Sequence, residues 1–304
     1  MLKVLFLGTS AARPTVERNV SGLVVTREGE SLLFECGEGT QRQMMRYGVS
    51  FALSDIFFTH FHADHFLGII GLIRTLGLQG RTEPMRFFGP RGAKRVLGAA
   101  LGLGVERATF EVEIVEVEPG QTLSRGDYEI RAFAVEHGGG ALGYALVEKD
   151  RLGRFNPDRA RELGVPEGPL WGKLQRSQSV TLEDRRVVGP ESIVGAPRPG
   201  RKLVYTGDTR PCAAAVDAAA EADLLVHEAT FGEEEAERAR ETLHATAREA
   251  AQVALAAGVR RLVLTHLSAR YSRDPAPLLE EARGVFAETV VAKDGMEIEV
   301  AFRE

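Results

Sequence analysis

Short apolar runs alternate with amphipathic stretches from one end of the chain to the other. Compact apolar runs predict strands, and apolar residues spaced three and four apart predict helices. Because the two kinds alternate, the pattern indicates an α/β protein. The predicted strands are 3–7, 22–26, 31–35, 55–59, 112–117, 128–135, 143–147, 202–206, 223–227, 261–265 and 296–301, and the predicted helices are 68–78, 92–103, 157–163, 212–220, 233–256 and 275–287.

One stretch, residues 149–202, interrupts this pattern. It is rich in Gly, Pro and charge, has few apolar runs, and carries twelve Lys or Arg against seven Asp or Glu. Long connections of this kind are more often functional or mobile than inert. We therefore predict one domain over 1–304 with an inserted basic arm at 149–202; a solvated surface insertion is the alternative.

Composition narrows the class of protein. With 304 residues, 44% hydrophobic and 27% charged, the chain matches an ordinary soluble globular protein. Its apolar runs are strand-sized, and the N-terminus does not resemble a signal peptide. Two distant cysteines, Cys36 and Cys212, suit a reducing, cytoplasmic location. The net charge of −5 means that any contact with nucleic acid must be local.

Four side chains of metal-binding type lie within six residues, directly after a predicted strand and before a predicted helix. They are His60, His62, Asp64 and His65. Imidazole and carboxylate groups are the usual ligands of zinc and related metals, and so dense a cluster is costly to bury without a metal. A single histidine at a strand end is usually only a polar loop residue, but four such residues together predict a metal site.

Further candidates follow other predicted strands. His137, Asp208, His227 and His266 each lie at the end of an apolar run. Because sites in α/β proteins assemble where the carboxyl ends of strands meet, these distant residues are expected to converge on the cluster at 60–65. The sequence therefore predicts one site built from several strand ends.

A His-x-His-x-Asp-His segment followed by a distant His, Asp and His resembles the metallo-β-lactamase superfamily. The resemblance implies a four-layer αββα sandwich with two Zn²⁺ per chain, or Mn²⁺ or another divalent metal in their place. It assigns His60, His62 and His137 to the first metal, Asp64, His65 and His266 to the second, and Asp208 to a bridging position. Two adjacent metals can bind an activated hydroxide and stabilise the oxygens of a phosphodiester, and Asp64 is expected to accept the proton.

Two shorter motifs distinguish members of this superfamily. His227-Glu228-Ala229-Thr230 and His244-Ala245-Thr246, the latter placed early in a predicted helix, resemble motifs of the tRNase Z family. Cleavage of a phosphodiester needs a proton for the leaving alkoxide, and a histidine paired with a carboxylate can supply it. In this interpretation His244 is the general acid and Glu228 orients it.

The resemblance to tRNase Z extends along nearly the whole chain and implies an endoribonuclease that removes the 3′ trailer of precursor tRNA. It implies that the arm, with Trp171, grips tRNA and that the protein is a homodimer. Arg18, Ser268 and Arg270 are candidate substrate contacts. In the N-terminal loop Val16 replaces a basic residue of the family, so the treatment of CCA-containing precursors stays open.

Two other functions remain as alternatives. A phosphodiesterase for small substrates such as cyclic nucleotides could use the same site, although a small ester would not need a basic arm. A metal- and RNA-binding protein without catalysis is the other alternative, which the retention of Glu228 and His244 disfavours. Turnover of a phosphodiester, compared with binding alone, separates these classes.

Overall fold

The computed structural model describes residues 1–105 and 107–303, which divide into two compact units. The first comprises 1–147 and 202–301, and the second comprises 148–201 with the C-terminal residues from Phe302. None of the helices in the described part of the chain has the length and apolar character needed to cross a bilayer.

The first unit contains two seven-stranded sheets, ordered β16-β1-β2-β3-β4-β5-β6 and β15-β14-β13-β12-β9-β8-β7. The strands are β1 (Leu2–Gly8), β2 (Gly22–Arg27), β3 (Glu30–Phe34), β4 (Asp55–Phe57), β5 (Met85–Gly89), β6 (Val112–Glu116), β7 (Thr122–Ser124), β8 (Tyr128–Ala134), β9 (Leu142–Glu148), β12 (Lys202–Tyr205), β13 (Leu224–Glu228), β14 (Leu262–Thr265), β15 (Thr289–Val291) and β16 (Glu297–Glu299). The helices are α1 (Thr40–Arg46), α2 (Ala63–Phe66), α3 (Ile69–Leu78), α4 (Ala93–Leu101), α7 (Ala213–Ala219), α8 (Ala236–Glu241), α9 (Ala247–Ala257) and α10 (Ala276–Arg283), with 3₁₀ turns η2 (Glu233–Glu235) and η3 (Ala269–Tyr271).

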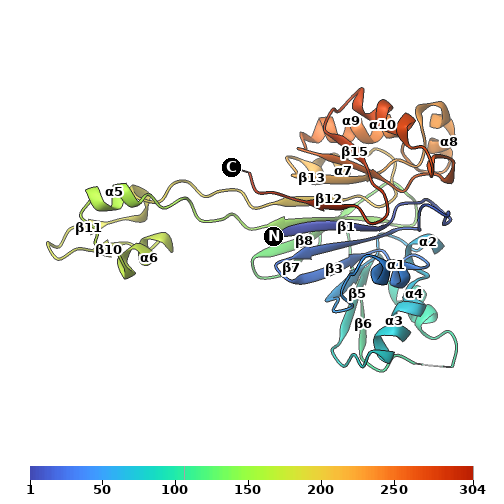
Figure 1. The fold of residues 1–304 in the computed structure, drawn as a ribbon, viewed down its shortest axis with the longest axis horizontal. Helices are drawn as coiled ribbons and strands as arrows, with labels where there is room; N and C mark the ends of the chain where they lie inside the picture. Colours follow the sequence, from blue (N-terminus) through green and yellow to red (C-terminus); the bar gives the residue numbers. More distant parts are fainter. Residues whose placement is uncertain (106, 304) are drawn as a thin grey trace. The chain divides into compact units, whose positions relative to one another are not determined.

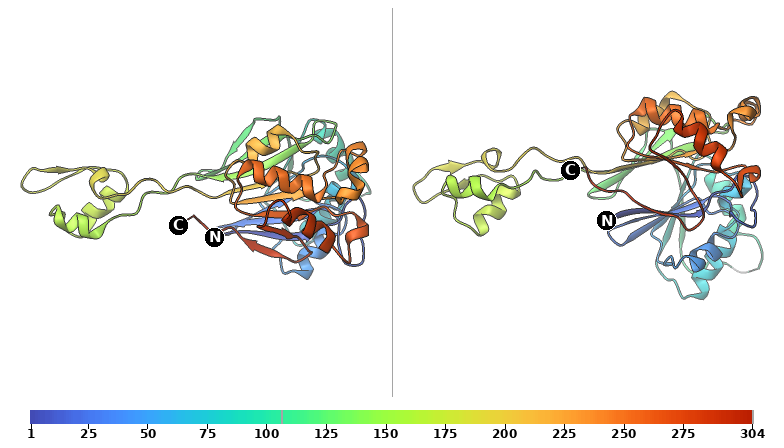
Figure 2. Two further views of the ribbon diagram at one scale, coloured as in Figure 1. Left: turned by 90° about the horizontal axis from the view of Figure 1, so that it is seen from above. Right: turned by 45° about the horizontal axis from the view of Figure 1, so that its top comes forward.

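Because side chains alternate in direction along the strands, the apolar residues form three layers. In β1, Leu2, Val4 and Phe6 point into the core between the two sheets, whereas Leu7 joins the layer under the helices. Successive side chains of a strand face opposite sides, so a strand covered on both faces is apolar at most positions. Figures 1 and 2 show α1, α3 and α4 over one sheet and α7, α9 and α10 over the other. The predicted four-layer αββα sandwich is confirmed.

Strand direction determines where the site forms. Strands β3 to β6 run parallel in one sheet, and β12 to β15 run parallel in the other. The loops after β4, β12, β13 and β14 therefore leave their sheets at corresponding ends. Every predicted strand overlaps an observed one, while β5, β7 and β15 were not predicted.

The second unit has more structure than the sequence suggested. Only a helix at 157–163 was predicted there, but the unit contains α5 (Pro157–Glu162), α6 (Pro169–Gln175), β10 (Val180–Thr181), β11 (Val187–Val188) and the 3₁₀ turn η1 (Pro190–Ser192). Its own apolar core consists of Ala160, Val165, Leu174, Val180, Leu182, Val188 and Ile193, with Phe155, Leu163, Leu170 and Trp171 packed against it. Its few apolar residues are thus gathered into one cluster.

Candidate metal centre and the residues that support it

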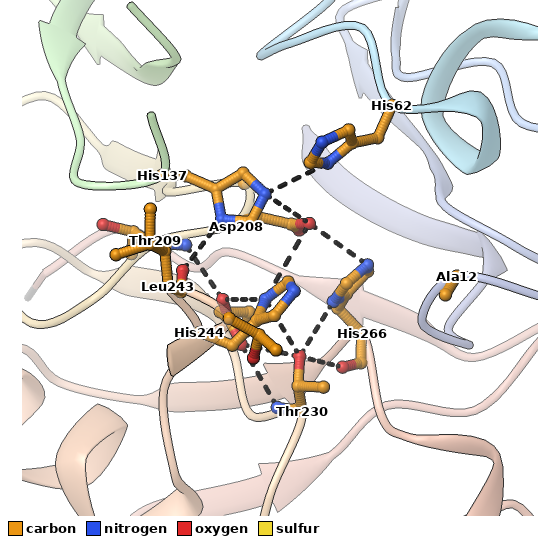
Figure 3. A network of polar contacts seen from close by, with 12 residues as sticks. Ala12, His62, His137, Asp208, Thr209, Thr230, Leu243, His244 and His266 are labelled. Carbon is orange, nitrogen blue, oxygen red and sulfur yellow. Dashed lines mark hydrogen bonds and ion pairs between the residues drawn. The ribbon is translucent and has the colours of Figure 1, made fainter. Parts of the chain in front are cut away.

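The predicted ligands come together in the first unit. Residues 58–62 lead from β4 into α2, which carries Asp64 and His65 in its single turn. His137 follows β8, Asp208 follows β12 and His266 follows β14. Figure 3 shows the side chains of His62, His137, Asp208 and His266 turned toward one another. All seven predicted ligands belong to groups of side chains whose potential ligand atoms lie within 4.8 Å of one another.

Asp208 occupies the middle of this cluster. Its Oδ2 atom lies 3.3 Å from Nε2 of His65, 3.4 Å from Nε2 of His266, and 3.6 Å from Nε2 of both His60 and His137. Gly207 allows the backbone just before Asp208 to pass close to Thr59: its φ is +63°, and a Cβ there would lie 2.7 Å from the Thr59 side chain. The position of Asp208 between the two groups of histidines is the one expected for a bridging carboxylate.

The first group consists of three imidazoles. Nδ1 of His62 lies 3.0 Å from Nε2 of His60 and 3.2 Å from Nε2 of His137. Burial lowers the pKa of His60 well below its ordinary value, and burial together with His137 lowers the pKa of His62. His60 and His62 are therefore favoured in the neutral form that binds metals.

The second group combines a carboxylate with two imidazoles. Oδ2 of Asp64 lies 3.3 Å from Nε2 of His266 and 3.4 Å from Nε2 of His65. The backbone N–H of Ala12 donates to the same oxygen at 2.8 Å. Burial opposes ionisation of Asp64, but the hydrogen bond from His266 and the nearby imidazole of His65 hold its pKa well below the usual range. Asp64 is therefore an ionised candidate ligand that the N-terminal loop holds in place.

Unpaired buried atoms test whether a cation fits here. Both ring nitrogens of His65 and Oδ1 of Asp208 are buried without a hydrogen-bond partner. Native structures rarely leave buried polar atoms unpaired, because each such atom costs free energy. The donor set is nitrogen and oxygen only, which suits a divalent transition metal. The residues present therefore fit a divalent metal.

Two buried residues, Thr59 and Glu35, lie behind the imidazoles of His60 and His65. Thr59 donates a short hydrogen bond to Glu35, and its hydroxyl lies 3.0 Å from Nδ1 of His60. Oε1 of Glu35 is also 3.4 Å from Nδ1 of His65. Partners of this kind set the tautomer and orientation of ligating histidines. Glu35 was not among the residues predicted from the sequence, although it is an acidic residue that directly follows β3.

His244 and Glu228 form a hydrogen-bonded pair beside the candidate ligands. Nδ1 of His244 lies 2.7 Å from Oε1 of Glu228, and 4.0 Å from Oδ2 of Asp208. Glu228 ends β13 and is fully buried. Burial alone would lower the pKa of His244, but the Glu228 carboxylate outweighs it and raises the pKa to about 9. The geometry is that of a histidine whose proton is held by a carboxylate.

His244 does not lie in a helix, which corrects the predicted helix 233–256. The chain forms η2, α8 and α9, with a break at 242–246. Leu243 has a φ of +59°, and Thr246 begins α9 with a capping box that it shares with Glu249. The break also allows the Leu243 carbonyl to accept from Nδ1 of His137 at 2.8 Å. Figure 3 shows this backbone beside His137.

Thr230 links this pair to the metal ligands. Its hydroxyl is 2.7 Å from Oε2 of Glu228 and 3.0 Å from Nδ1 of His266 (Figure 3). A hydroxyl donates one hydrogen bond and accepts others, so Thr230 can donate to Glu228 and accept from Nδ1–H of His266. That tautomer leaves Nε2 of His266 facing Asp64 and Asp208. The sequence motif contained Thr230, but its role was visible only in three dimensions.

Other predicted residues have different surroundings. Arg18 is only 5% exposed, and its guanidinium donates to Thr9, the Ala292 carbonyl and the Ser272 carbonyl, so it anchors the N-terminal loop. Arg270 forms an ion pair with Glu235. Ser268 lies just before η3, two residues from His266. The suggestion that His227 contributes to the site is wrong: it lies within β13, and its Nδ1 faces the Glu228 carbonyl at 2.7 Å.

Comparisons with known proteins identify the family of this chain. Residues 2–153 match the family model of anti-Pycsar protein Apyc1, and 189–267 match that of the beta-lactamase superfamily domain. The whole chain is 62% identical to a ribonuclease Z of Gemmatimonas aurantiaca and 59% identical to one of Myxococcus xanthus, covering 97% and 99% of those proteins. It resembles the crystal structure of human tRNase Z, short form, with a TM-score of 0.73 and 28% identity over 99% of this chain and 100% of that one. With full-length identity of this extent, the chain belongs to the ribonuclease Z family, within the metallo-β-lactamase superfamily.

Proposed function

We propose that this protein is an endoribonuclease that removes the 3′ trailer from precursor tRNA by hydrolysis of a phosphodiester. The observation that carries the proposal is the His244–Glu228 contact of 2.7 Å beside the ligand cluster. A thiolester hydrolase has no use for such a pair, because a thiolate leaves without a proton, whereas a poor alkoxide leaving group needs one. Relatives named ribonuclease Z match the chain over its full length, which supports the same substrate class.

The proposed metal content is two divalent ions per chain, with zinc as the expected metal. His60, His62 and His137 would hold one ion, Asp64, His65 and His266 the other, and Asp208 both. Bound there, such a pair would activate water for attack and offset charge developing on the phosphate.

The protein's own groups then have separate roles. Asp64, fixed by the Ala12 N–H, is proposed to accept the proton that the attacking water loses. His244 is proposed to donate a proton to the leaving ribose oxygen as its bond to phosphorus breaks. Glu228 is a positioning residue: it accepts from Thr209 N–H, Thr230 and Ala245 N–H as well as facing His244, so its carboxylate is fixed from several sides. Ser268, next to the ligand loop, remains a proposed phosphate contact.

The metal assignment has a direct test. Asp208→Ala should lose the paired ions, because one carboxylate serves both groups of ligands. Elemental analysis of the purified variant should give fewer than one metal per chain, against two for the wild type. A single tightly bound ion in fully active wild-type protein would contradict the dinuclear assignment.

Incubation with a precursor tRNA carrying a 3′ trailer tests the activity itself. The wild type should release the trailer in one endonucleolytic cut, which mapping of both products would locate. A cyclic nucleotide assayed in parallel tests the small-substrate alternative. Turnover of the cyclic nucleotide without cleavage of the precursor would overturn the proposal, and binding of tRNA without either reaction would favour the non-catalytic alternative.

We also propose that the second unit is an arm that docks the tRNA body, and that the protein is a homodimer. Replacement of residues 151–197 by a short Gly/Ser bridge removes the core of this unit and none of the proposed ligands. The shortened protein should keep its metals and hydrolyse bis(p-nitrophenyl) phosphate, but process tRNA slowly. In a separate measurement, light scattering of the wild-type protein tests whether it is a homodimer. A metal-loaded deletion variant that processes tRNA at the wild-type rate would contradict the role of the arm.

A further inference from the structure

A pocket of about 490 Å³ opens beside the first group of metal ligands, entirely within the first unit. One side is formed by His60, His62 and His137. The other side comes from the segment that joins β5 to α4 and from the first turn of α4, with Arg91 and Arg95 in the lining. The pocket thus continues from the reacting centre onto a surface that sequence analysis had not connected with it.

The two arginines are available to a ligand. Both are exposed, and among the described residues neither side chain makes a hydrogen bond or an ion pair with the protein. Outside residues 149–202 the chain carries a net charge of −10, so this pair of cations stands out from an acidic background. Arginine without a protein partner beside a phosphodiesterase centre is suited to bind phosphate, because its planar fork matches phosphate oxygens.

The backbone at this end of α4 does not provide the anion site. Oε1 of Glu116 already accepts from the N–H groups of Gly92 at 2.9 Å and Lys94 at 3.2 Å. Positive charge available to a ligand here therefore resides in the side chains. Lys94 is exposed as well, but it is not part of the pocket lining.

The remaining walls suit a nucleotide. Phe61 lines the pocket and is partly exposed, and the centre of its ring lies 6.2 Å from that of Phe58 and 6.0 Å from that of Phe66. Gly138 and Gly139 form part of the lining with φ of +73° and +58°. A side chain at either position would be strained in this conformation and would narrow the pocket. An aromatic ring and a floor without side chains leave room for a base and ribose.

We infer that this pocket holds the ribonucleotide adjoining the scissile phosphate, with Arg91 and Arg95 on its phosphate oxygens and Phe61 against its base or ribose. The inference rests on the proposed function and adds specificity-determining residues to it. The ligand is a phosphodiester-linked ribonucleotide on either side of the cut. Its source is the tRNA end on one side and the trailer on the other, and the experiment distinguishes them.

The test is steady-state cleavage of precursor tRNA by R91A/R95A, with K94A as the matched control. K94A removes an exposed cation from the same helix turn without touching the pocket lining. The double variant should lose roughly 10- to 100-fold in kcat/KM, mainly through KM, because charge-assisted contacts to phosphate are lost. The slope of log KM against log salt should fall by about 1.4–1.8, which corresponds to two phosphate contacts. R91K/R95K should restore most of the salt slope.

Two further readouts separate a substrate contact from a structural effect. Metal content and turnover of bis(p-nitrophenyl) phosphate should match the wild type, because that ester does not extend into the pocket. Binding of mature tRNA should weaken in the double variant if the pocket holds the tRNA end, and stay unchanged if it holds the trailer.

Several results would overturn the inference. Equal KM and salt slope in R91A/R95A and wild type would do so, as would an equal loss in K94A or a parallel loss with bis(p-nitrophenyl) phosphate. These results all require a wild type that cuts precursor tRNA. Failure of the wild type to cut would instead overturn the proposed function.

Discussion

Single residues next to the proposed ligands determine the orientation and the tautomer of the ligating histidines. Thr230 is the clearest case, because its one hydroxyl touches both Glu228 and His266. Thr230→Val keeps the shape and removes the hydroxyl. We expect a loss of about 10- to 100-fold in metal affinity or activity, the usual effect of removing a partner of a ligating histidine. Metal titration and turnover of bis(p-nitrophenyl) phosphate would measure both.

A matched variant makes this result specific. Thr242→Ala removes a hydroxyl that is not part of the site: it donates to the Arg238 carbonyl of the preceding helix turn at 2.8 Å. It should leave metal affinity unchanged. Thr230→Val with wild-type affinity and turnover would show that His266 keeps its orientation without the hydroxyl.

The proposed proton donor can be separated from the metal site by a double-mutant cycle. His244→Ala should retain metal and tRNA binding but lower turnover by about 10²–10⁴-fold, the usual contribution of a positioned general acid. Glu228→Gln should lower turnover as well, and the double variant should be little worse than His244→Ala, because the two groups act as one unit.

A substrate with a good leaving group provides the control for this cycle. Bis(p-nitrophenyl) phosphate needs little help from an acid, so both variants should retain most of their activity toward it. Full activity of His244→Ala toward precursor tRNA would remove this residue from the mechanism.

For single residues, the sequence predicted the side chains of distinctive chemistry, but it could not predict the roles of backbone groups. The cluster from His60 to His65 predicts a metal site because few other roles gather such residues. The Ala12 N–H on Asp64 and the Leu243 carbonyl on His137 are backbone groups, and any residue carries them. Only the path of the chain reveals their roles.

The helical elements show why local patterns can place a residue wrongly. Residues 233–256 have helical spacing and contain no proline, so one helix was predicted. Tertiary contacts override that pattern at 242–246: the Ala245 N–H donates to Glu228 at 3.1 Å, and the His244 carbonyl accepts from Arg210 at 2.5 Å. A continuous helix would have to give up these contacts. Conversely, α2 is a four-residue turn, too short to show a period.

Thr246 tests how much the start of α9 matters to the site. Its hydroxyl accepts from the Glu249 N–H at 3.2 Å, and its own N–H donates to the Glu249 carboxylate at 2.9 Å. Thr246→Ala should lower the free energy of unfolding by about 1 kcal/mol, as loss of an N-cap usually does. Because Glu249 also holds Arg210, and Arg210 holds the His244 carbonyl, turnover of precursor tRNA should fall too.

Two measurements distinguish these effects. Urea denaturation gives the change in stability, and turnover is assayed well below the denaturation midpoint. Thr246→Ser retains the cap and should restore both properties. A stability loss with unchanged turnover would mean that His244 keeps its position independently of the cap.

On the scale of the whole molecule, Phe302 and Arg303 belong to the second unit, although the strands nearest to them in sequence belong to the first. Two guanidinium groups lie over the ring of Phe302: their Cζ atoms are 3.5 Å (Arg151) and 4.0 Å (Arg201) from its centre. Arg201 is buried in an ion pair with Glu148 at 2.7 Å. Contacts between residues so far apart in sequence leave no local pattern, so the sequence could not predict that Phe302 belongs to this unit.

The second unit also shows that counting charges is a coarse guide to binding. The sequence indicated an excess of five positive charges at 149–202. Several of these cations already pair within the unit: Arg159 with Glu162, Arg161 with Asp158 and Glu167, and Arg186 with Asp184. By contrast, the exposed side chains of Lys173, Arg176 and Arg185 have no ion-pair partner among the described residues.

This distinction gives a sharper test of tRNA docking than removal of the whole unit. The triple variant K173Q/R176Q/R185Q should bind precursor tRNA more weakly, because cations without protein partners are free to neutralise phosphates. Its binding should also depend less on salt, with the slope of log K against log salt reduced by about 2–3 if each cation contacts one phosphate. The control R159A/E162A removes an exposed ion pair without changing net charge, and such pairs contribute little to stability. It should bind like the wild type, and all proteins should hydrolyse bis(p-nitrophenyl) phosphate equally. If the triple variant kept both the affinity and the salt slope of the wild type, these cations would not be the contacts, and docking by the positive charge of this unit would lose its main support.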